Sequence, residues 1–142
     1  MKIQKSIIIF MLLPFLASAQ GILQENQYGK QLYFVDGTYL RTENAYGDRL
    51  VYWDPPYLKQ EDQYGEKLYW IEGEEVREKD QYGNKLLFFD GLYIREKDRY
   101  GEKLYFLDGL KLRREDQYGE VLYYFKTIPE KWMIAFLILK ND

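Results

Sequence analysis

Residues 80–97 read DQYGNKLLFFDGLYIREK, and residues 98–115 repeat the pattern as DRYGEKLYFLDGLKLRRE. The dipeptide Tyr-Gly marks each copy and recurs every 18 residues, with its tyrosines at Tyr28, Tyr46, Tyr64, Tyr82, Tyr100 and Tyr118. Ile22 and Leu23 match the tail of a partial unit before the first full copy. A fixed period of this length indicates a repeat architecture, in which neighbouring units bury against one another what none can bury alone.

Each unit has the pattern of a β-hairpin. Residues 85–89, Lys-Leu-Leu-Phe-Phe, and residues 92–95, Leu-Tyr-Ile-Arg, are rich in side chains that suit a pleated sheet. The Asp-Gly dipeptide at 90–91 lies between them and predicts a two-residue type I′ turn, because both residue types tolerate a positive φ. Each unit is therefore expected to form a strand, a turn and a second strand.

The turns also predict how the strands pair. A two-residue loop at Asp-Gly places Lys85 opposite Glu96, and a pair of opposite charges stabilises a ladder. The other turn, Asp-Gln-Tyr-Gly, suits a type I turn whose Asp carboxylate accepts a backbone N–H and whose Gly adopts the left-handed conformation of a bulge. Asp-Pro-Pro at 54–56 replaces Asp-Gly in the second unit and predicts a wider turn or an edge position, because proline cannot donate to a ladder.

Alternation along the strands divides the side chains into two faces. The face taken as the core carries Tyr33, Val35, Leu40, Val51, Trp53, Leu58, Tyr69, Ile71, Val76, Leu87, Phe89, Ile94, Tyr105, Leu107, Leu112, Tyr123 and Phe125. The opposite face carries aromatic and basic side chains and the leucines Leu32, Leu50, Leu68, Leu86, Leu104 and Leu122. Eleven or twelve short strands exceed what an open, strongly twisted sheet usually carries. We therefore predict an all-β fold of tandem 18-residue β-hairpin repeats, forming a meander that curls, closes or stacks as a solenoid.

The start of the chain has the pattern of a secretory signal peptide. Residues 1–19 begin with a short basic region, continue with a mostly apolar run over 6–17, and end on Ala-Ser-Ala, with cleavage expected after Ala19. An uncleaved membrane anchor is the alternative. Cleavage leaves a β-hairpin repeat domain over 20–125 in a protein that is exported to a periplasmic, cell-surface or extracellular location.

Residues 126–142 depart from the repeat and are expected to form a C-terminal capping segment. Thr-Ile-Pro-Glu at 127–130 has the spacing of a capping box with proline in the first turn, and an apolar run follows over 132–139. This pattern predicts a short helix or strand that closes the end of the array. Eight apolar residues are too few to cross a bilayer, so we expect no transmembrane segment in the mature chain.

Composition argues against most catalytic chemistry. Cysteine and histidine are both absent, which removes thiol catalysis, the usual general base near neutral pH and the commonest transition-metal ligand. The 20 basic and 23 acidic side chains create no excess positive field, so nucleic acid is not an expected partner. We therefore expect no enzyme, no cofactor and no metal site.

The consensus Asp-x-Tyr-Gly-x-Lys-Leu-Tyr-Phe-x-Asp-Gly-x-Tyr-Ile-Arg resembles the short Tyr/Gly-rich hairpin repeats of exported or uncharacterised bacterial proteins, such as those called four-fold β-flowers. The resemblance is one of pattern and covers about residues 22–125. Choline-binding repeats and MORN repeats are similar in using aromatic hairpins punctuated by glycine. Their unit lengths and their tryptophan or glycine placements differ, so no ligand is carried over from them.

The second face of the hairpins is the candidate ligand-binding surface. Its candidate residues are Phe34, Tyr39, Tyr52, Tyr57, Trp70, Arg77, Phe88, Tyr93 and Arg95. Aromatic rings supply rigid contact area, and arginine stacks on rings or pairs with carboxylate or phosphate groups. The expected function is a non-catalytic binding or scaffolding module of the bacterial envelope or exterior, with a polysaccharide or an envelope protein as its partner. The alternative for the rings is that they only form cross-strand pairs, such as Phe34 with Tyr39.

Two other functions are weighed against binding, namely a carboxylate-based glycan-active enzyme and a calcium-binding structural repeat protein. A catalytic pair of acids should be singular, but most acids here recur at turns or strand ends in every unit. Calcium takes about six to eight oxygen ligands, and each Asp-bearing turn offers one carboxylate. Both alternatives therefore rank below a binding module.

Overall fold

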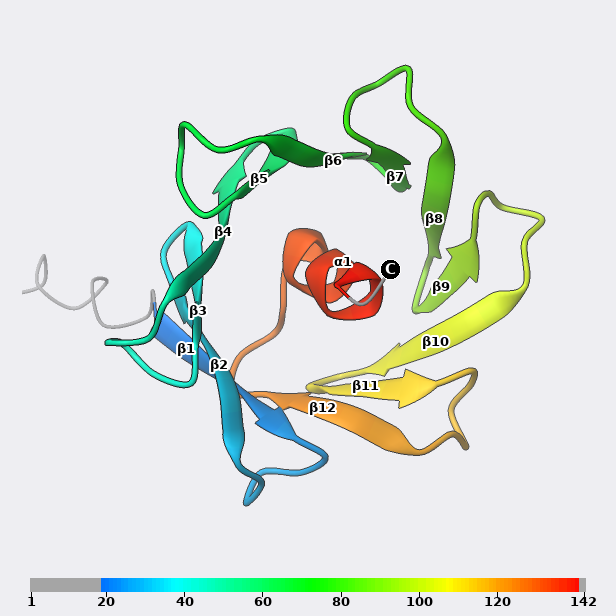
Figure 1. The fold of residues 1–142 in the computed structure, drawn as a ribbon. Helices are drawn as coiled ribbons and strands as arrows, with labels where there is room; N and C mark the ends of the chain where they lie inside the picture. Colours follow the sequence, from blue (N-terminus) through cyan, green and yellow to red (C-terminus); the bar gives the residue numbers. More distant parts are fainter. Residues whose placement is uncertain (1–18, 141–142) are drawn as a thin grey trace, which may run out of the picture.

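The computed structural model describes residues 19–140, which form twelve strands and one helix (Figure 1). The strands are β1 (Ala19–Gln24), β2 (Gln31–Asp36), β3 (Tyr39–Thr42), β4 (Arg49–Asp54), β5 (Tyr57–Gln60), β6 (Lys67–Glu72), β7 (Glu75–Glu78), β8 (Lys85–Asp90), β9 (Tyr93–Glu96), β10 (Lys103–Asp108), β11 (Lys111–Arg114) and β12 (Val121–Phe125). The helix is α1 (Lys131–Leu139). The predicted signal peptide, apart from Ala19, lies outside the described residues.

The strands form an antiparallel meander that closes into a barrel (Figure 1). Each strand pairs with its neighbour in sequence, and β1 pairs with both β2 and β12. Phe125 of the sixth unit is equivalent to Val35 of the first. Val35 pairs with Leu40 of its own hairpin, whereas Phe125 pairs with Ile22 of β1, so β1 takes the place of the missing short strand of the sixth unit. The all-β repeat fold is confirmed, and of the arrangements left open the chain adopts the closed one.

The predicted core face points into the barrel. Its most deeply buried members are Val35, Leu40, Val51, Leu58, Ile71, Val76, Leu87, Phe89, Ile94, Leu112 and Phe125. The tyrosines of this face, together with Trp53 and Leu107, are partly buried and pack against that cluster. The assignment of the core is therefore confirmed.

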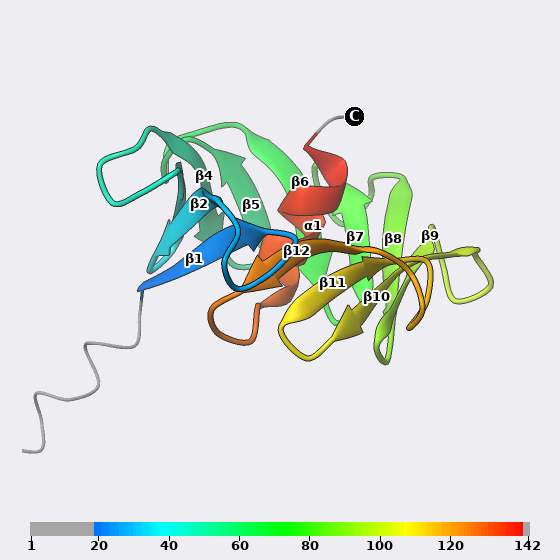
Figure 2. The same cartoon turned by 90° about the horizontal axis from the view of Figure 1, so that it is seen from below.

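Helix α1 fills the middle of the barrel instead of capping an end of the array (Figures 1 and 2). Trp132 is 1% exposed and stacks on Trp53 with 6.0 Å between ring centroids. Phe136 meets Tyr33 edge to face at 5.6 Å. A ring of twelve strands encloses more space than the side chains of its own wall fill, so an apolar segment is needed inside. The expected cap is thus a central core element.

The capping box expected at 127–130 does not form. Glu130 is the N-cap residue of α1, and its side chain makes no capping hydrogen bond to the backbone. Its carboxylate instead accepts a hydrogen bond from the indole Nε1–H of Trp132 at 3.2 Å. Burial of the apolar helix, rather than a side-chain cap, therefore stabilises this segment.

The hairpin register differs from the prediction by a shift of the turn. The loop consists of the glycine and the residue after it, so Asp90 pairs with Tyr93, and Leu87 instead of Lys85 lies opposite Glu96. In these loops only the glycine has a positive φ, 62° at Gly91, as the first central position of a type II′ turn requires. Moving the loop by one residue moves each partner by two positions, so the shift of the turn by itself moves no side chain to the other face.

The proline-containing hairpin keeps the same short loop. Asp54 pairs with Tyr57, and Pro55 and Pro56 are the two loop residues. The wider turn or edge position expected for residues 54–56 is therefore wrong. Neither proline is required to donate to the ladder, and the carbonyl of Pro56 accepts a hydrogen bond from the N–H of Ile71 at 2.7 Å.

A β-bulge turns the repeated leucines toward the core. Leu40 pairs with Val51 and Arg41 with Arg49, which leaves Leu50 as the extra residue of its strand. An extra residue interrupts the alternation of a strand, so that the leucine is no longer confined to the outer face. The leucines Leu50, Leu68, Leu86 and Leu104 pack against the core, which corrects their assignment to the outer face.

The Tyr-Gly turn is a type I turn in which glycine serves a different purpose from the one expected. Asp62 accepts the N–H of Tyr64 on its carboxylate and the N–H of Gly65 on its carbonyl, both at 2.9 Å. The left-handed residue is Glu61, with a φ of 64°. A Cβ on Gly65 would lie 1.6 Å from the carbonyl oxygen of Gln60, so the glycine is required by close approach of the backbone and not by a positive φ.

Candidate functional site

Six tyrosine side chains stand almost fully in solvent at the tips of the long turns. We call them the tyrosine tips, and their exposed fractions run from 86% to 96% for Tyr28, Tyr46, Tyr64, Tyr82, Tyr100 and Tyr118. The turns that join β5 to β6, β7 to β8 and β9 to β10 project outward from the ring (Figure 1). Side chains this exposed contribute almost nothing to the burial that stabilises the barrel.

In the sequence these tyrosines mark the repeat, and the candidate surface predicted from the sequence does not include them. A signal was available, because an aromatic residue is not needed at the third position of a type I turn, where most residue types are accepted. The neighbouring position is occupied by glutamine, alanine or arginine in different copies, whereas tyrosine is present in all six.

The predicted outer-face rings lie on the outside of the barrel, but several of them have partners within the chain. Tyr93 lies 5.0 Å from Phe106, and the Nζ of Lys103 lies 4.0 Å from the centre of its ring. Tyr57 has the Nζ of Lys67 at 3.9 Å from its ring centre. These cations and rings cover faces on which a ligand would have to stack.

The ring pairs lie between hairpins and not within them. Tyr39 pairs with Tyr52 of the next unit at 4.9 Å, whereas Phe34 lies opposite Arg41. The expected pairing of Phe34 with Tyr39 is therefore wrong, as a consequence of the shifted turn. The remaining outer-face candidates Trp70 and Phe88 lie directly opposite Arg77 and Arg95.

The candidate arginines brace the turns. Arg77 forms an ion pair with Glu75 at 2.8 Å, and Arg95 forms one with Asp90 at the same distance. Each also donates from Nη1 to the glycine carbonyl of the following Tyr-Gly turn, at 3.3 Å for Arg77 and 2.9 Å for Arg95. Their guanidinium groups hold a turn in place, so only part of their hydrogen-bonding capacity faces solvent.

A groove on the outer face brings a tyrosine tip close to the strand residues of the preceding unit. It has a volume of about 380 Å³, within the range of small-ligand sites, and Tyr93 and Arg95 are the two candidate residues that line it. Lys103, Glu115 and the tip Tyr118 complete its walls. The sequence-derived candidates are therefore joined here by residues that the sequence analysis did not assign.

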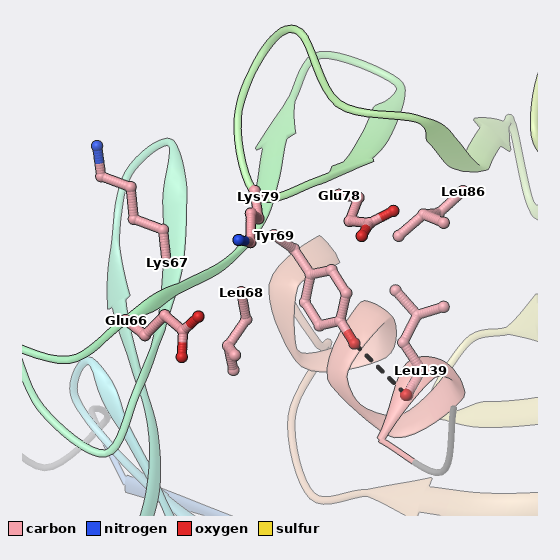
Figure 3. Close-up of a pocket in the computed structure, with 8 residues that line it drawn as sticks. All are labelled: Glu66, Lys67, Leu68, Tyr69, Glu78, Lys79, Leu86 and Leu139. Atoms are coloured by element: carbon pink, nitrogen blue, oxygen red, sulfur yellow. Dashed lines mark hydrogen bonds between the residues drawn. The ribbon is translucent and has the colours of Figure 1, made fainter.

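A second kind of cavity lies at the mouth of the barrel beside the end of α1 (Figure 3). Its volume is about 330 Å³, with Leu68, Leu86 and Leu139 among its apolar lining. The hydroxyl of Tyr69 points to the carbonyl of Leu139 at 3.5 Å, while the side chain of Lys67 extends away from the helix (Figure 3). This cavity can accept a small apolar group, with the charged side chains of Glu66, Glu78 and Lys79 at its walls.

Two tyrosines of the core face predict a loss of stability at high pH. Burial raises the pKa of Tyr33, against an opposing effect of Lys140, and burial raises the pKa of Tyr123, in each case above the ordinary value of 10.0. The folded state therefore keeps its phenolic protons longer than the unfolded state, and unfolding is favoured once the pH exceeds 10. We expect the melting temperature to fall as the pH rises above the ordinary tyrosine pKa of 10.0, less steeply in the Tyr33→Phe/Tyr123→Phe variant. Equal slopes for the two proteins would contradict this account.

The described residues 19–140 contain no cluster of three or more acidic side chains able to hold a metal ion. The turn carboxylates are used locally, as in the bond from the N–H of Tyr82 to Asp80 Oδ1 at 2.8 Å. Within the same span, no helix has the length and apolar character needed to cross a membrane.

In comparisons with known proteins, no family model, no curated protein and no solved structure matches this chain.

Proposed function

We propose that the protein is an exported, non-catalytic binding or scaffolding module of the bacterial envelope or exterior, and that it holds its partner on the tyrosine tips. The observation that carries the proposal is that six aromatic side chains are 86–96% exposed at equivalent turns. Tyrosine is a frequent anchor of binding surfaces, because it offers a large contact area with few rotatable bonds.

Export is supported by the secretory pattern of residues 1–19 and by the resemblance of the repeat to the hairpin repeats of exported bacterial proteins. The finer assignment to four-fold β-flower type repeats belongs to the same proposal. The outer-face candidates Phe34, Tyr39, Tyr52, Tyr57, Trp70, Phe88 and Tyr93, with Arg77 and Arg95, then support the turns from which the tips project. Phe88, Tyr93 and Arg95 also line grooves beside the tips.

The turns are built to hold the tips in one place. In the turn of Tyr64, the carboxylate of Asp62 accepts the tyrosine N–H, and the N–H of Glu61 donates to the carbonyl of Leu50 at 3.0 Å. The Nζ of Lys59 donates to the carbonyl of Gln63 at 3.0 Å. A turn ordered in this way loses little backbone entropy when a partner binds, which favours affinity.

Removal of three tips tests the proposal. We expect Tyr64→Ala/Tyr82→Ala/Tyr100→Ala to reduce retention on isolated bacterial cell walls at least about tenfold, because each anchor contributes to one binding surface. The melting temperature should change little, since the three side chains are exposed. The measurement is a pull-down with quantified bound protein.

Leu92→Ala and Ile128→Ala are the control variants, because both are exposed apolar side chains outside the Tyr-Gly turns. They should retain most of the binding if the tips are the contacts. No retention of the unmodified protein, or equal retention of the triple variant, would contradict the proposal.

A further inference from the structure

Two outer grooves are copies of each other, one repeat apart. The first, of about 380 Å³, is lined by Tyr93, Lys103 and the tip Tyr118, and the second, of about 140 Å³, by Lys85 and the tip Tyr100 at equivalent positions. We call these two the outer grooves. Each has a tyrosine tip in its wall, so a chain-like ligand that runs from one groove to the other passes a tyrosine tip.

The two outer grooves carry opposite surplus charges. The larger groove has two cations and three carboxylates, namely Arg95, Lys103, Glu102, Glu115 and Asp116. The smaller groove has three cations and two carboxylates, namely Lys85, Lys97, Arg99, Glu75 and Asp98. The two grooves therefore do not share the same sign of net charge. A ligand that occupies both grooves gains no consistent attraction from carrying a net charge of either sign.

All six Tyr-Gly turns carry an aromatic tip, and most of them also carry an amide that exchanges hydrogen bonds with hydroxyls. In four of the six turns the residue before the tyrosine is an exposed glutamine, namely Gln27, Gln63, Gln81 and Gln117. An amide both donates and accepts, and a phenol ring offers a flat apolar surface with a hydroxyl at its edge. A pyranose ring presents the complementary surface, with an apolar C–H face and a rim of hydroxyls.

The fold explains the glycine of each turn but not its tyrosine. A Cβ at Gly101 would lie 1.7 Å from the carbonyl of Glu96, so this position admits only glycine. Tyr100 is 86% exposed, and no comparable constraint acts on its side chain. Retention of tyrosine in every copy is therefore better explained by a ligand that meets the same group repeatedly than by folding.

We propose that the partner on the tyrosine tips is an uncharged polysaccharide, whose successive sugar rings stack on successive tips and whose hydroxyls bond to the polar walls of the outer grooves. The inference rests on the proposed binding function and adds the class of ligand. A polymer matches the site because its own repeat lets one molecule engage several equivalent positions, so that weak single contacts add up to firm retention.

The test measures retention of the full mature protein on insoluble chitin, cellulose and curdlan, with alginate beads and heparin-agarose as anionic comparisons. We expect retention on at least one of the three neutral polymers, unchanged when NaCl is raised from about 0.1 to about 1 M, because screening weakens ionic contacts selectively. Tyr100→Ala/Tyr118→Ala should weaken binding by about tenfold or more, and Tyr100→Phe/Tyr118→Phe should keep most of it.

Leu92→Ala is the matched control, because Leu92 is a 54% exposed apolar side chain in the loop between β8 and β9 and not in a Tyr-Gly turn. It should bind as the unmodified protein does. Retention on the anionic materials alone, or equal losses in the Phe and Ala variants, would overturn the uncharged-glycan inference. Tip-dependent retention on cell walls without retention on any of the three polymers would also overturn it, while leaving the proposed binding function intact. No tip-dependent retention on any material would overturn both.

Discussion

Gly101→Ala is expected to lower the free energy of unfolding by about 3 kcal/mol or more. The new Cβ would lie 1.7 Å from the carbonyl oxygen of Glu96 and 3.1 Å from that of Asp98. Both obstacles are backbone atoms, which cannot rotate away as a side chain does. The turn must open, and opening it disturbs the hydrogen bond from the N–H of Gly101 to Asp98.

Gly91→Ala is the matched control. Gly91 has a φ of 62°, and a Cβ there meets nothing within 4 Å, so the substitution costs only the strain of the left-handed conformation, about 1 to 2 kcal/mol. Urea unfolding followed by far-UV circular dichroism compares the two variants. The close-approach explanation fails if Gly91→Ala is the more damaging substitution.

Trp132→Ala is expected to destabilise the barrel by about 3 to 5 kcal/mol, because the substitution empties the largest side-chain volume in its centre. Trp132 is 1% exposed and stacks on Trp53 across the gap between helix and wall. Partial collapse of the wall cannot refill such a space, since the ring of strands has a fixed circumference. The denaturant midpoint and the loss of a buried tryptophan emission component report the effect.

Ile128→Ala is the control, because it removes an exposed apolar side chain from the same C-terminal segment. Ile128 is 76% exposed, so its truncation should change the unfolding free energy by less than about 0.5 kcal/mol. If both substitutions were equally mild, α1 would not be the element that fills the barrel.

The core could be predicted from the sequence because the alternation of side chains does not depend on the exact position of the two-residue loop. A shift of the loop from Asp90-Gly91 to the glycine and Leu92 changes each cross-strand partner by two positions. Side chains in a strand repeat their direction every two residues, so Ile94 stays inside under either register. The turn type itself depended on which residues accept a positive φ, and only Gly91 does in this loop.

The bulges and the position of the helix could not be predicted in the same way. Leu50 begins the unbroken apolar and aromatic run 50–53, in which nothing marks an extra residue. The bulge is evident only from the pairing of Leu40 with Val51 and of Arg41 with Arg49. The apolar run that becomes α1 is compatible with an end cap as well as with a central core. The choice depends on closure between β1 and β12, which is a property of the whole ring.

The sequence analysis places the candidate surface on the outer face of the hairpins, and the exposed fractions of the turn tyrosines add the tyrosine tips to the candidates. Arg77 and Arg95 have the chemistry of ligand-binding groups, yet in the folded chain they form ion pairs and donate hydrogen bonds to the turn carbonyls, which no sequence pattern indicates. For the tyrosine tips the difficulty is the reverse. Tyr64 is evident in the sequence as part of a repeated motif, but the motif does not say whether the turn needs its side chain. The exposed fraction of 87% shows that the side chain lies in solvent and is not required for packing.

Because the ring is closed, the number of repeats must match the bulk of α1, the helix that fills its centre. An open array can lengthen by duplication, because a new unit adds one more junction of the kind already present. In this chain an inserted 18-residue unit would widen the ring around α1 and part Trp132 from Trp53, while a deleted unit would leave the helix no room. Variants of this architecture should therefore change their copy number and the bulk of their central helix together.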